Sequence, residues 1–225
     1  EPKSILLEPF GRNTAPAITL AALSTLKNKE DPNLLILSAD HFIQNKDKFQ
    51  ELIKIGLKYS SKGKIMTFGV PPTRPETGYG YIETEEDFKM DSSSAIQIKR
   101  FIEKPFEGEA KKMILNGNYL WNSGIFLGKS SVLIEEIKKF CPDIYQTCLE
   151  TLNSSRKDLN FIRLGKDPFL KCPNISFDIA VMEKTDLGFV IPMDVGWSDV
   201  GTWNSLWMES SKDDSGNVKS GNVIL

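Results

Sequence analysis

The sequence predicts an α/β fold, in which helices flank a mixed and mostly parallel sheet, on two observations. Residues 33–40 (NLLILSAD) contain an unbroken apolar run, which is typical of a strand buried on both faces. Short apolar runs of this kind alternate along the chain with segments whose apolar residues recur at helical spacing. This alternation indicates βαβ units with right-handed crossovers.

The first five elements are expected in the order strand, helix, strand, helix, strand. The first helix has the clearest start, because Asn13 or Thr14 can cap it and Pro16 lies in its first turn, where a missing N–H costs no hydrogen bond. Gly63 ends the second helix. The five elements cover residues 4–9, 14–29, 33–40, 46–63 and 64–70.

The second half of the chain continues the pattern and then changes character. Two strands flank a polar insertion at 87–94, helical segments over 132–152 break at Pro142, and a further strand covers 189–195. Near the end, a Ser-Gly-Asn-Val unit occurs at 215–218 and again at 220–223. We interpret this repeat as the first coil of a further β region, which predicts a main domain over 1–211 and the start of a second region over 212–225.

The composition excludes several classes of function. A net charge of -2 and a pI near 5.6 give no general attraction to nucleic acid or to anionic membranes. The single histidine excludes a His-rich zinc site, and three cysteines without a CxxC pair suit a reducing compartment. No apolar run of about 18 residues and no signal peptide are visible, so a cytoplasmic protein without membrane or nucleic-acid partners is expected.

Residues 69–82 (GVPPTRPETGYGYI) form a loop of unusual composition. Its prolines fix φ, and Gly78 and Gly80 remove side chains beside Tyr79. The combination predicts a loop that is held in one shape and lets a ligand approach its backbone.

Two carboxylates follow predicted strands at positions far apart in the chain. Asp40 ends the most apolar strand, and Asp199 lies at a bend between Gly196 and Gly201. Ligands of open α/β sheets bind outside the carboxyl ends of strands, where two such groups can hold Mg²⁺ together with phosphates. The alternative is that both aspartates merely cap the helices that follow them.

Other polar residues suit a phosphorylated sugar. Glu103 and Lys104 precede Pro105 at a strand end, where a carboxylate can accept hydrogen bonds from hydroxyls and a lysine can face a phosphate. Asn122 lies among aromatic residues in YLWNSGIF (119–126), and Asp178 and Lys184 lie on a predicted helix. Each of these residues also has an ordinary interpretation as a solvated charge or a core contact.

Taken together in order, the motifs resemble those of mannose-1-phosphate guanylyltransferases over almost the whole chain. The resemblance implies a Rossmann-like nucleotidyltransferase domain that joins GTP and mannose 1-phosphate, with Mg²⁺, to give GDP-mannose and pyrophosphate. The motifs are EPFGRNTAPAI, LSADHFI, PTRPETGYGYI, FIEKP, YLWNSGIF, FIRL, CPNISFDIAVMEKT and DVGWSDVGTWNSLW.

The same resemblance implies a role for each candidate residue. Asp40 and Asp199 look like metal ligands and, with Lys104, like the catalytic residues. It also implies a nucleotide site at Pro9, Asn13 and Thr14, and a sugar-binding loop at Gly78, Tyr79 and Gly80. Glu103, Asn122 and Asp178 would bind the sugar hydroxyls, and Lys104 and Lys184 would bind the phosphate.

The chain departs from the family pattern at both ends. The glycine-rich loop that such enzymes place near their start does not precede Glu1, so this chain is expected to be incomplete for turnover. Residues 212–225 resemble the entry to a C-terminal β-helical region, through which the full-length protein is expected to form a homodimer. Two alternatives stay open: a sugar 1-phosphate nucleotidyltransferase for another base or hexose, and a non-catalytic regulatory paralogue that binds GDP-mannose.

Overall fold

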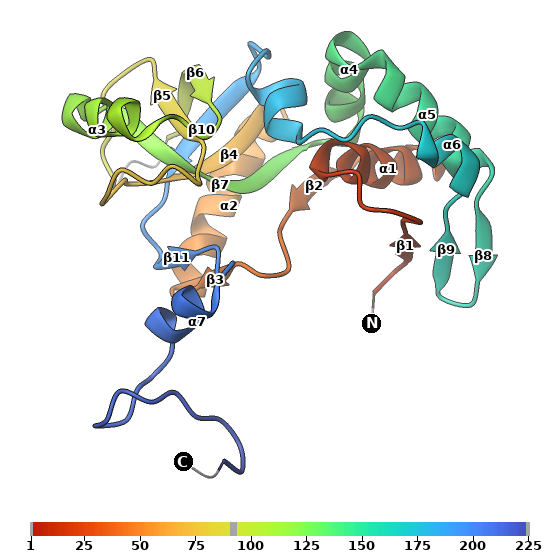
Figure 1. Ribbon diagram of the computed structural model, residues 1–225. Helices are drawn as coiled ribbons and strands as arrows, with labels where there is room; N and C mark the ends of the chain where they lie inside the picture. Colours follow the sequence, from red (N-terminus) through yellow and green to blue (C-terminus); the bar gives the residue numbers. More distant parts are fainter. Residues whose placement is uncertain (1, 91–93, 224–225) are drawn as a thin grey trace.

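A twisted six-stranded sheet forms the centre of the protein in the computed structural model, which describes residues 2–90 and 94–223 (Figure 1). Its order is β2-β7-β4-β10-β6-β5. The strands are β2 (Asn33–Ile36), β4 (Ile65–Val70), β5 (Tyr81–Thr84), β6 (Ile96–Ile102), β7 (Tyr119–Lys129) and β10 (Gly188–Pro192).

The expectation of a mixed sheet is confirmed, but the expectation of a mostly parallel one is wrong. Within the central sheet only β4 and β10 pair in parallel, and the other five hydrogen-bonded pairs are antiparallel. The physical reason is β7, which runs between β2 and β4 in the opposite direction and also pairs with β5. The apolar run at 33–40 therefore forms a short, half-buried strand at one end of the sheet order, and Leu37 after it is 51% exposed.

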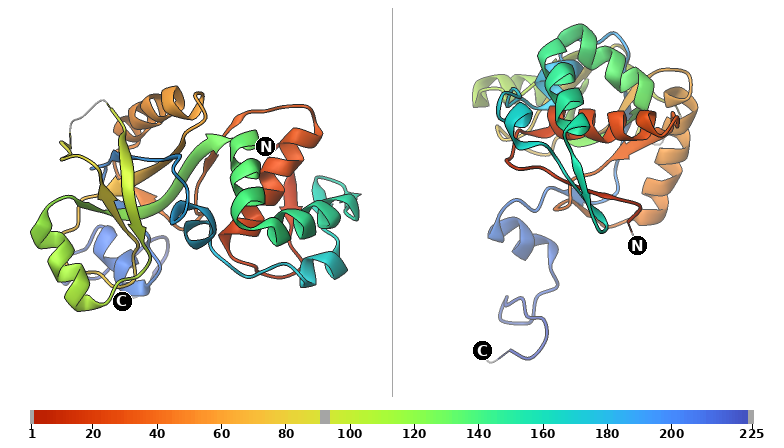
Figure 2. Two further views of the ribbon diagram at one scale, coloured as in Figure 1. Left: turned by 90° about the horizontal axis from the view of Figure 1, so that it is seen from above. Right: turned by 90° about the vertical axis from the view of Figure 1, so that its right-hand side faces the viewer.

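Strand β7 separates two hydrophobic clusters by the ordinary alternation of a strand. Phe126 packs into the larger cluster with α1 (Thr14–Lys27), α4 (Ser130–Phe140) and α5 (Pro142–Asn153). Its neighbours Ile125 and Leu127 pack on the other side, against α2 (Lys46–Ser60). Figure 2 shows α1, α4 and α5 grouped at one end of the molecule, with α3 (Glu107–Asn116) at the other.

The predicted helix boundaries hold where capping chemistry is present. The Asn13 side chain accepts a hydrogen bond from the Thr14 N–H at 2.9 Å, and Asn45 does the same for Lys48 at 3.0 Å. The predicted break at Pro142 is confirmed, because α4 ends at Phe140 and α5 begins at the proline. Cys141 between them is half-buried, and all three cysteines are free thiols.

Two smaller sheets lie outside the central one. The expected first strand exists as β1 (Ile5–Leu7), but it pairs in parallel with β9 (Phe161–Arg163), which pairs with β8 (Arg156–Asp158). The second sheet consists of β3 (Phe42–Ile43) and β11 (Trp197–Ser198). Two short helical segments precede β10, namely α6 (Lys166–Leu170) and a π-helical turn (Asp178–Met182).

The C-terminal segment extends away from the body after α7 (Trp203–Glu209) (Figure 1). Residues 212–223 form turns and contain no strand, so the described part of the predicted β region is not β-helical. Residues 224–225, and residues 91–93 of the predicted polar insertion, lie outside the described part. Within the described residues, no helix is both long and apolar enough to cross a membrane.

Gly69 in β4 gives a test of how tightly the central strands pack. A Cβ there would lie 2.7 and 2.8 Å from Leu120 atoms and 2.8 Å from Val190. We expect Gly69→Ala to lower the free energy of unfolding by about 1–3 kcal/mol, because both neighbours are held in the sheet. Urea denaturation followed by circular dichroism measures the change.

Gly108 in α3 provides the matched control, since a Cβ there would meet no atom within 4 Å. Gly108→Ala should raise the free energy of unfolding by roughly 0.5–1 kcal/mol, the usual gain for alanine in a helix. If the Gly69→Ala variant is as stable as the unchanged protein, Leu120 and Val190 can move away from the new methyl group, and the tight packing inferred here is wrong.

Candidate active site

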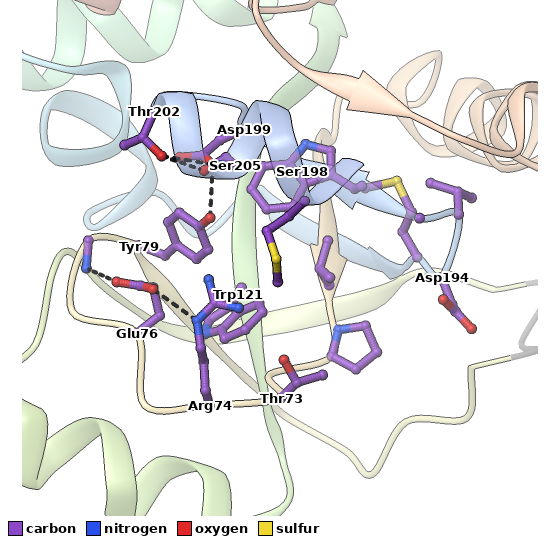
Figure 3. A pocket seen from close by; sticks show the side chains of 18 residues that line it. Thr73, Arg74, Glu76, Tyr79, Trp121, Asp194, Ser198, Asp199, Thr202 and Ser205 are labelled. Atoms are coloured by element: carbon purple, nitrogen blue, oxygen red, sulfur yellow. Dashed lines mark hydrogen bonds and ion pairs between the residues drawn. The ribbon is translucent and has the colours of Figure 1, made fainter. Parts of the chain in front are cut away.

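A cavity of about 960 Å³ opens between the loop after β4 and the segment that leads into α7 (Figure 3). Trp121 of β7 lines its floor, and Tyr79, Asp194 and Asp199 line its walls. Thr202, Ser205 and Met208 border it from the α7 side. Segments that are far apart in the sequence therefore meet around one space.

The loop at 69–82 is held by its own polar contacts, in agreement with its predicted rigidity. Arg74 Nε lies 3.1 Å from Glu76 Oε2, and the Gly78 N–H donates to Glu76 Oε1 at 3.1 Å. The Arg74 guanidinium also lies over the Trp121 ring, 5.5 Å from its centroid. These contacts leave Gly78 at the cavity surface.

A side chain at Gly80 would collide with neighbouring residues, apart from any effect on access for a ligand. A Cβ there would lie 2.9 Å from Glu103 Oε2 and 3.3 Å from the Phe101 ring. The glycine thus makes room for the Glu103 carboxylate directly beside the loop backbone. Its carbonyl accepts a hydrogen bond from the Asn122 N–H at 2.8 Å, which joins the loop to β7.

Tyr79 connects the loop to Asp199. Its hydroxyl donates to Asp199 Oδ1 at 3.0 Å, and its ring packs edge-on against Trp121 and Trp197, with centroids 5.3 and 5.5 Å away. Burial and the adjacent carboxylate raise the pKa of Tyr79 to about 12, so the phenol remains a donor at neutral pH.

Asp40 and Asp199 are brought together by the pairing of β3 with β11. Phe42 lies opposite Ser198 in that pair, so the residues just before β3 run alongside those just after β11. His41 reports this proximity: burial lowers its pKa, while the charges of both Asp40 and Asp199 act to raise it. Asp40 is exposed and Asp199 half-buried, and the Trp197 indole N–H donates to His41 Nδ1 at 3.4 Å.

The donor set at this point is two carboxylates from remote parts of the chain. Among the described residues, no three His, Cys, Asp or Glu side chains gather closely enough to hold a metal on their own. Such a site does not fit zinc, which takes three or four protein ligands. It does fit Mg²⁺, which is commonly held by one or two carboxylates and completes its shell with waters and substrate phosphates.

A second, more buried polar group lies on the other side of the loop. The Asn122 side chain donates to Asp178 Oδ1 at 2.7 Å, and its own oxygen accepts from the Thr67 hydroxyl at 3.1 Å. Thr67 thereby fixes which way the amide points. Lys104 Nζ lies 3.6 Å from Glu103 Oε1.

Burial shifts both carboxylates of this group in the same direction. Asp178 is 9% exposed, and its pKa is raised by burial. The pKa of Glu103 is raised first by burial and then by the charge of Asp178, while Lys104 acts to lower it. The charges of Glu103 and Asp178 therefore repel each other. The exposed Lys104 ammonium partly offsets this repulsion.

The start of α1 adjoins this second group. The Phe177 N–H donates to the Thr14 hydroxyl at 2.8 Å, and the Ala15 N–H donates to the Ile175 carbonyl at 3.2 Å. Thr14 and Asn13 are exposed, and each side chain already holds one backbone N–H. Their location beside Asp178 suits a nucleotide, but their oxygens are partly committed to the fold.

Two predicted site residues lack such a connection. Pro9 is half-buried and does not line the cavity. Lys184 is exposed, and its ammonium makes no ion pair or hydrogen bond within the described residues.

Sequence reasoning missed the residues that complete the cavity. Arg74 and Trp197 are identified only by the loop contacts and the ring stacking described above. Trp121, which lines the cavity, carries one of the six buried polar side-chain atoms that have no hydrogen-bond partner in the described part of the chain. Atoms of this kind mark places where a ligand or water completes the hydrogen bonding. No sequence pattern distinguishes them from ordinary core or surface positions.

Comparisons with known proteins identify the family of the chain. A family profile described as nucleotidyl transferase matches residues 2–216. A mannose-1-phosphate guanylyltransferase of Salmonella montevideo is 48% identical over 223 residues, which are 98% of this chain and 47% of the relative. The chain thus spans about half the length of the curated relatives it matches.

Two solved structures are similar as well. A mannose-6-phosphate isomerase from Helicobacter pylori has a TM-score of 0.78 and 30% identity, covering 86% of this chain and 74% of that one. A protein described as mannose-1-phosphate geranyltransferase, from Thermus thermophilus, has a TM-score of 0.76 and 31% identity, covering 90% and 56%. With the profile matching nearly its whole length, the chain belongs to the nucleotidyl transferase family.

Proposed function

We propose that the protein transfers a guanylyl group from GTP to mannose 1-phosphate, giving GDP-mannose and pyrophosphate. The observation that carries this proposal is the β3–β11 pairing, which places Asp40 near Asp199, a residue that lines one cavity together with the loop at 69–82. The names of two curated relatives, from Salmonella montevideo and Escherichia coli, support the choice of guanine and mannose.

In the proposed reaction, an oxygen of the sugar phosphate attacks the α-phosphorus of GTP in line. A new P–O bond forms, the bond to the β-phosphate oxygen breaks, and pyrophosphate leaves with the electron pair. Catalysis of this kind consists of positioning and charge neutralisation. Asp40 and Asp199 would hold Mg²⁺, which when bound neutralises charge on the phosphates.

Lys104 supplies the positive charge that this chain itself brings to the sugar phosphate. It is exposed, and it pairs only loosely with Glu103, at 3.6 Å. Its backbone has φ of 48°, in the left-handed region that a lysine rarely adopts, so the fold holds it in a strained position just before Pro105. Lys184 is proposed as the second lysine for the same phosphate.

Glu103, Asn122 and Asp178 are proposed to bind the mannose hydroxyls, beside the backbone of Gly78 and Gly80. Burial favours this role, because a hydroxyl group satisfies a buried carboxylate without bringing in a second charge. Asn122 is oriented by Thr67 and in turn holds Asp178, so the acceptors are fixed before the sugar arrives.

The remaining parts of the proposal rest on the family resemblance. They are the nucleotide contacts of Pro9, Asn13 and Thr14, a catalytic domain over 1–211, a homodimer, and a cytoplasmic location.

The function is tested by supplying the full-length protein with mannose 1-phosphate, Mg²⁺ and one nucleotide at a time. GDP-mannose should form from GTP and far more slowly from UTP or dTTP. Preference for another nucleotide, or for glucose 1-phosphate, would establish the alternative transferase. Binding of GDP-mannose without turnover would favour a regulatory paralogue.

Replacing Asp199 tests the metal site. Asp199→Asn should lower kcat/KM by about 100-fold or more, because one lost electrostatic contact in a transition state commonly has this effect. Steady-state kinetics at several Mg²⁺ concentrations measure the loss. Asp194→Asn is the matched control, since Asp194 lines the same cavity but is exposed at its far side (Figure 3). Similar losses in both variants would argue against a specific role for Asp199.

Replacing Lys104 tests the sugar-phosphate site. Lys104→Ala should raise KM for mannose 1-phosphate by roughly 10-fold and leave KM for GTP much less affected, since a charged hydrogen bond contributes about 1.5–3 kcal/mol. Lys112→Ala, at an exposed position in α3, serves as the control. An equal rise of both KM values in Lys104→Ala would contradict the assignment.

Replacing Asp178 separates binding from stability. Because burial raises its pKa in the folded protein, the unfolded chain loses this proton first as the pH rises above 3.8, and the folded state is increasingly disfavoured. Asp178→Asn should therefore raise the free energy of unfolding at pH 7 by about 1 kcal/mol, with no gain below pH 3.8, and weaken mannose 1-phosphate binding. Urea unfolding at pH 7 and below pH 3.8 measures both effects. A lower free energy of unfolding for Asp178→Asn at pH 7 would show that the folded protein favours the charged carboxylate.

A further inference from the structure

Tyr79 connects the predicted sugar-binding loop to Asp199, the proposed metal ligand. It lies in the loop at 69–82, and its hydroxyl donates to Asp199 Oδ1 at 3.0 Å across the cavity (Figure 3). The bond engages one carboxylate oxygen and leaves Asp199 Oδ2 without it. No other side-chain hydrogen bond to the Asp199 carboxylate occurs within the described residues.

The tyrosine ring has little freedom to release this bond. Trp121 of β7 and Trp197 of β11 meet it edge-on, at interplanar angles of 80° and 67°. Arg74 covers the Trp121 ring and is itself paired with Glu76 in the same loop. The direction of the phenol O–H is therefore set by the conformation of the whole loop.

We propose that Tyr79 is a positioning residue that fixes the Asp199 carboxylate for a divalent cation and couples that cation to occupancy of the sugar loop. This inference rests on the proposed function, in which Asp199 is a metal ligand. A hydrogen bond to one oxygen sets the rotation of the carboxylate and directs its other oxygen to the ion. Loss of such a partner commonly weakens metal binding 10–100-fold.

The coupling follows from the location of the donor. A sugar that orders the loop also orders the Tyr79 hydroxyl, and this stabilises the metal-binding orientation of Asp199. By thermodynamic linkage the cation must strengthen sugar binding by the same factor. The family resemblance alone assigns Tyr79 to the sugar, but its hydroxyl is already engaged with Asp199.

The experiment uses Mn²⁺ as the probe, because it takes oxygen ligands as Mg²⁺ does and its bound and free forms differ in electron paramagnetic resonance. Full-length protein is saturated with either GDP-mannose or GDP, neither of which turns over without pyrophosphate. Because the terminal phosphate of GDP carries an extra negative charge that itself attracts Mn²⁺, the variants are compared within each nucleotide complex. Mn²⁺ affinity is then measured for the unchanged protein and for Tyr79→Phe, Tyr81→Phe and Asp199→Asn.

Tyr81→Phe is the matched control, because Tyr81 is two residues away and fully buried, and its hydroxyl has no partner in the described structure. With GDP-mannose bound, Tyr79→Phe should weaken Mn²⁺ binding by about 10–100-fold while Tyr81→Phe leaves it unchanged. The fold-loss of Mn²⁺ affinity caused by Tyr79→Phe should be larger in the GDP-mannose complex than in the GDP complex, whereas Tyr81→Phe should cause no loss in either. Urea unfolding of both variants separates this effect from a loss of folding.

The outcomes distinguish the inference from the function beneath it. If Asp199→Asn binds Mn²⁺ as well as the unchanged protein, or if neither binds it, the proposed metal site is wrong. If Asp199→Asn loses Mn²⁺ and Tyr79→Phe retains it, the positioning role is wrong and the metal site stands. If Tyr79→Phe loses affinity equally with GDP-mannose and GDP, the residue positions Asp199 without coupling it to the sugar.

Discussion

The candidate site depends on the pairing of two very short strands, β3 and β11. They join residues 42–43 to 197–198, and this pairing aligns Asp40 and His41 with Asp199. So short a pair is weak by itself, since hairpins need further packing to persist. It is reinforced by backbone bonds from Gln44 and Asn45 to the Val195 carbonyl, and by the edge-on contact of His41 with Trp197. The convergence of the carboxylates is thus a tertiary effect, built from several small contacts.

Much of the local structure could be predicted because its causes are local. The cap at Asn13 and the break at Pro142 follow from the chemistry of those residues. The direction of the strands could not be predicted, because a short apolar run reads the same in parallel and antiparallel pairs. β7 is the clearest case: YLWNSGIF suggests Asn122 as a sugar-binding group, whereas the segment forms a central strand of the sheet, with Trp121 at the cavity.

The site was predictable in part for the same reason. Motifs identified the carboxylates, but no pattern indicates which ones meet, and the Tyr79–Asp199 bond spans 120 positions. Gly80 shows what the sequence leaves out: the glycine is expected to let a sugar approach the backbone, and the structure adds that a side chain there would also meet Glu103. Distances across a fold decide such roles, and they depend on packing that a single sequence does not reveal.

Burial divides the carboxylates of the site into two kinds. Asp40 and Asp199 retain contact with solvent, so a hydrated cation can reach them and exchange its waters for phosphate oxygens. Glu103 and Asp178 are more enclosed, their pKa values are raised, and an ion brought there would have to lose its water. Neutral hydroxyl groups suit that environment better. In the proposed function, the same residue type would therefore serve a metal at the exposed carboxylates and a sugar at the enclosed ones.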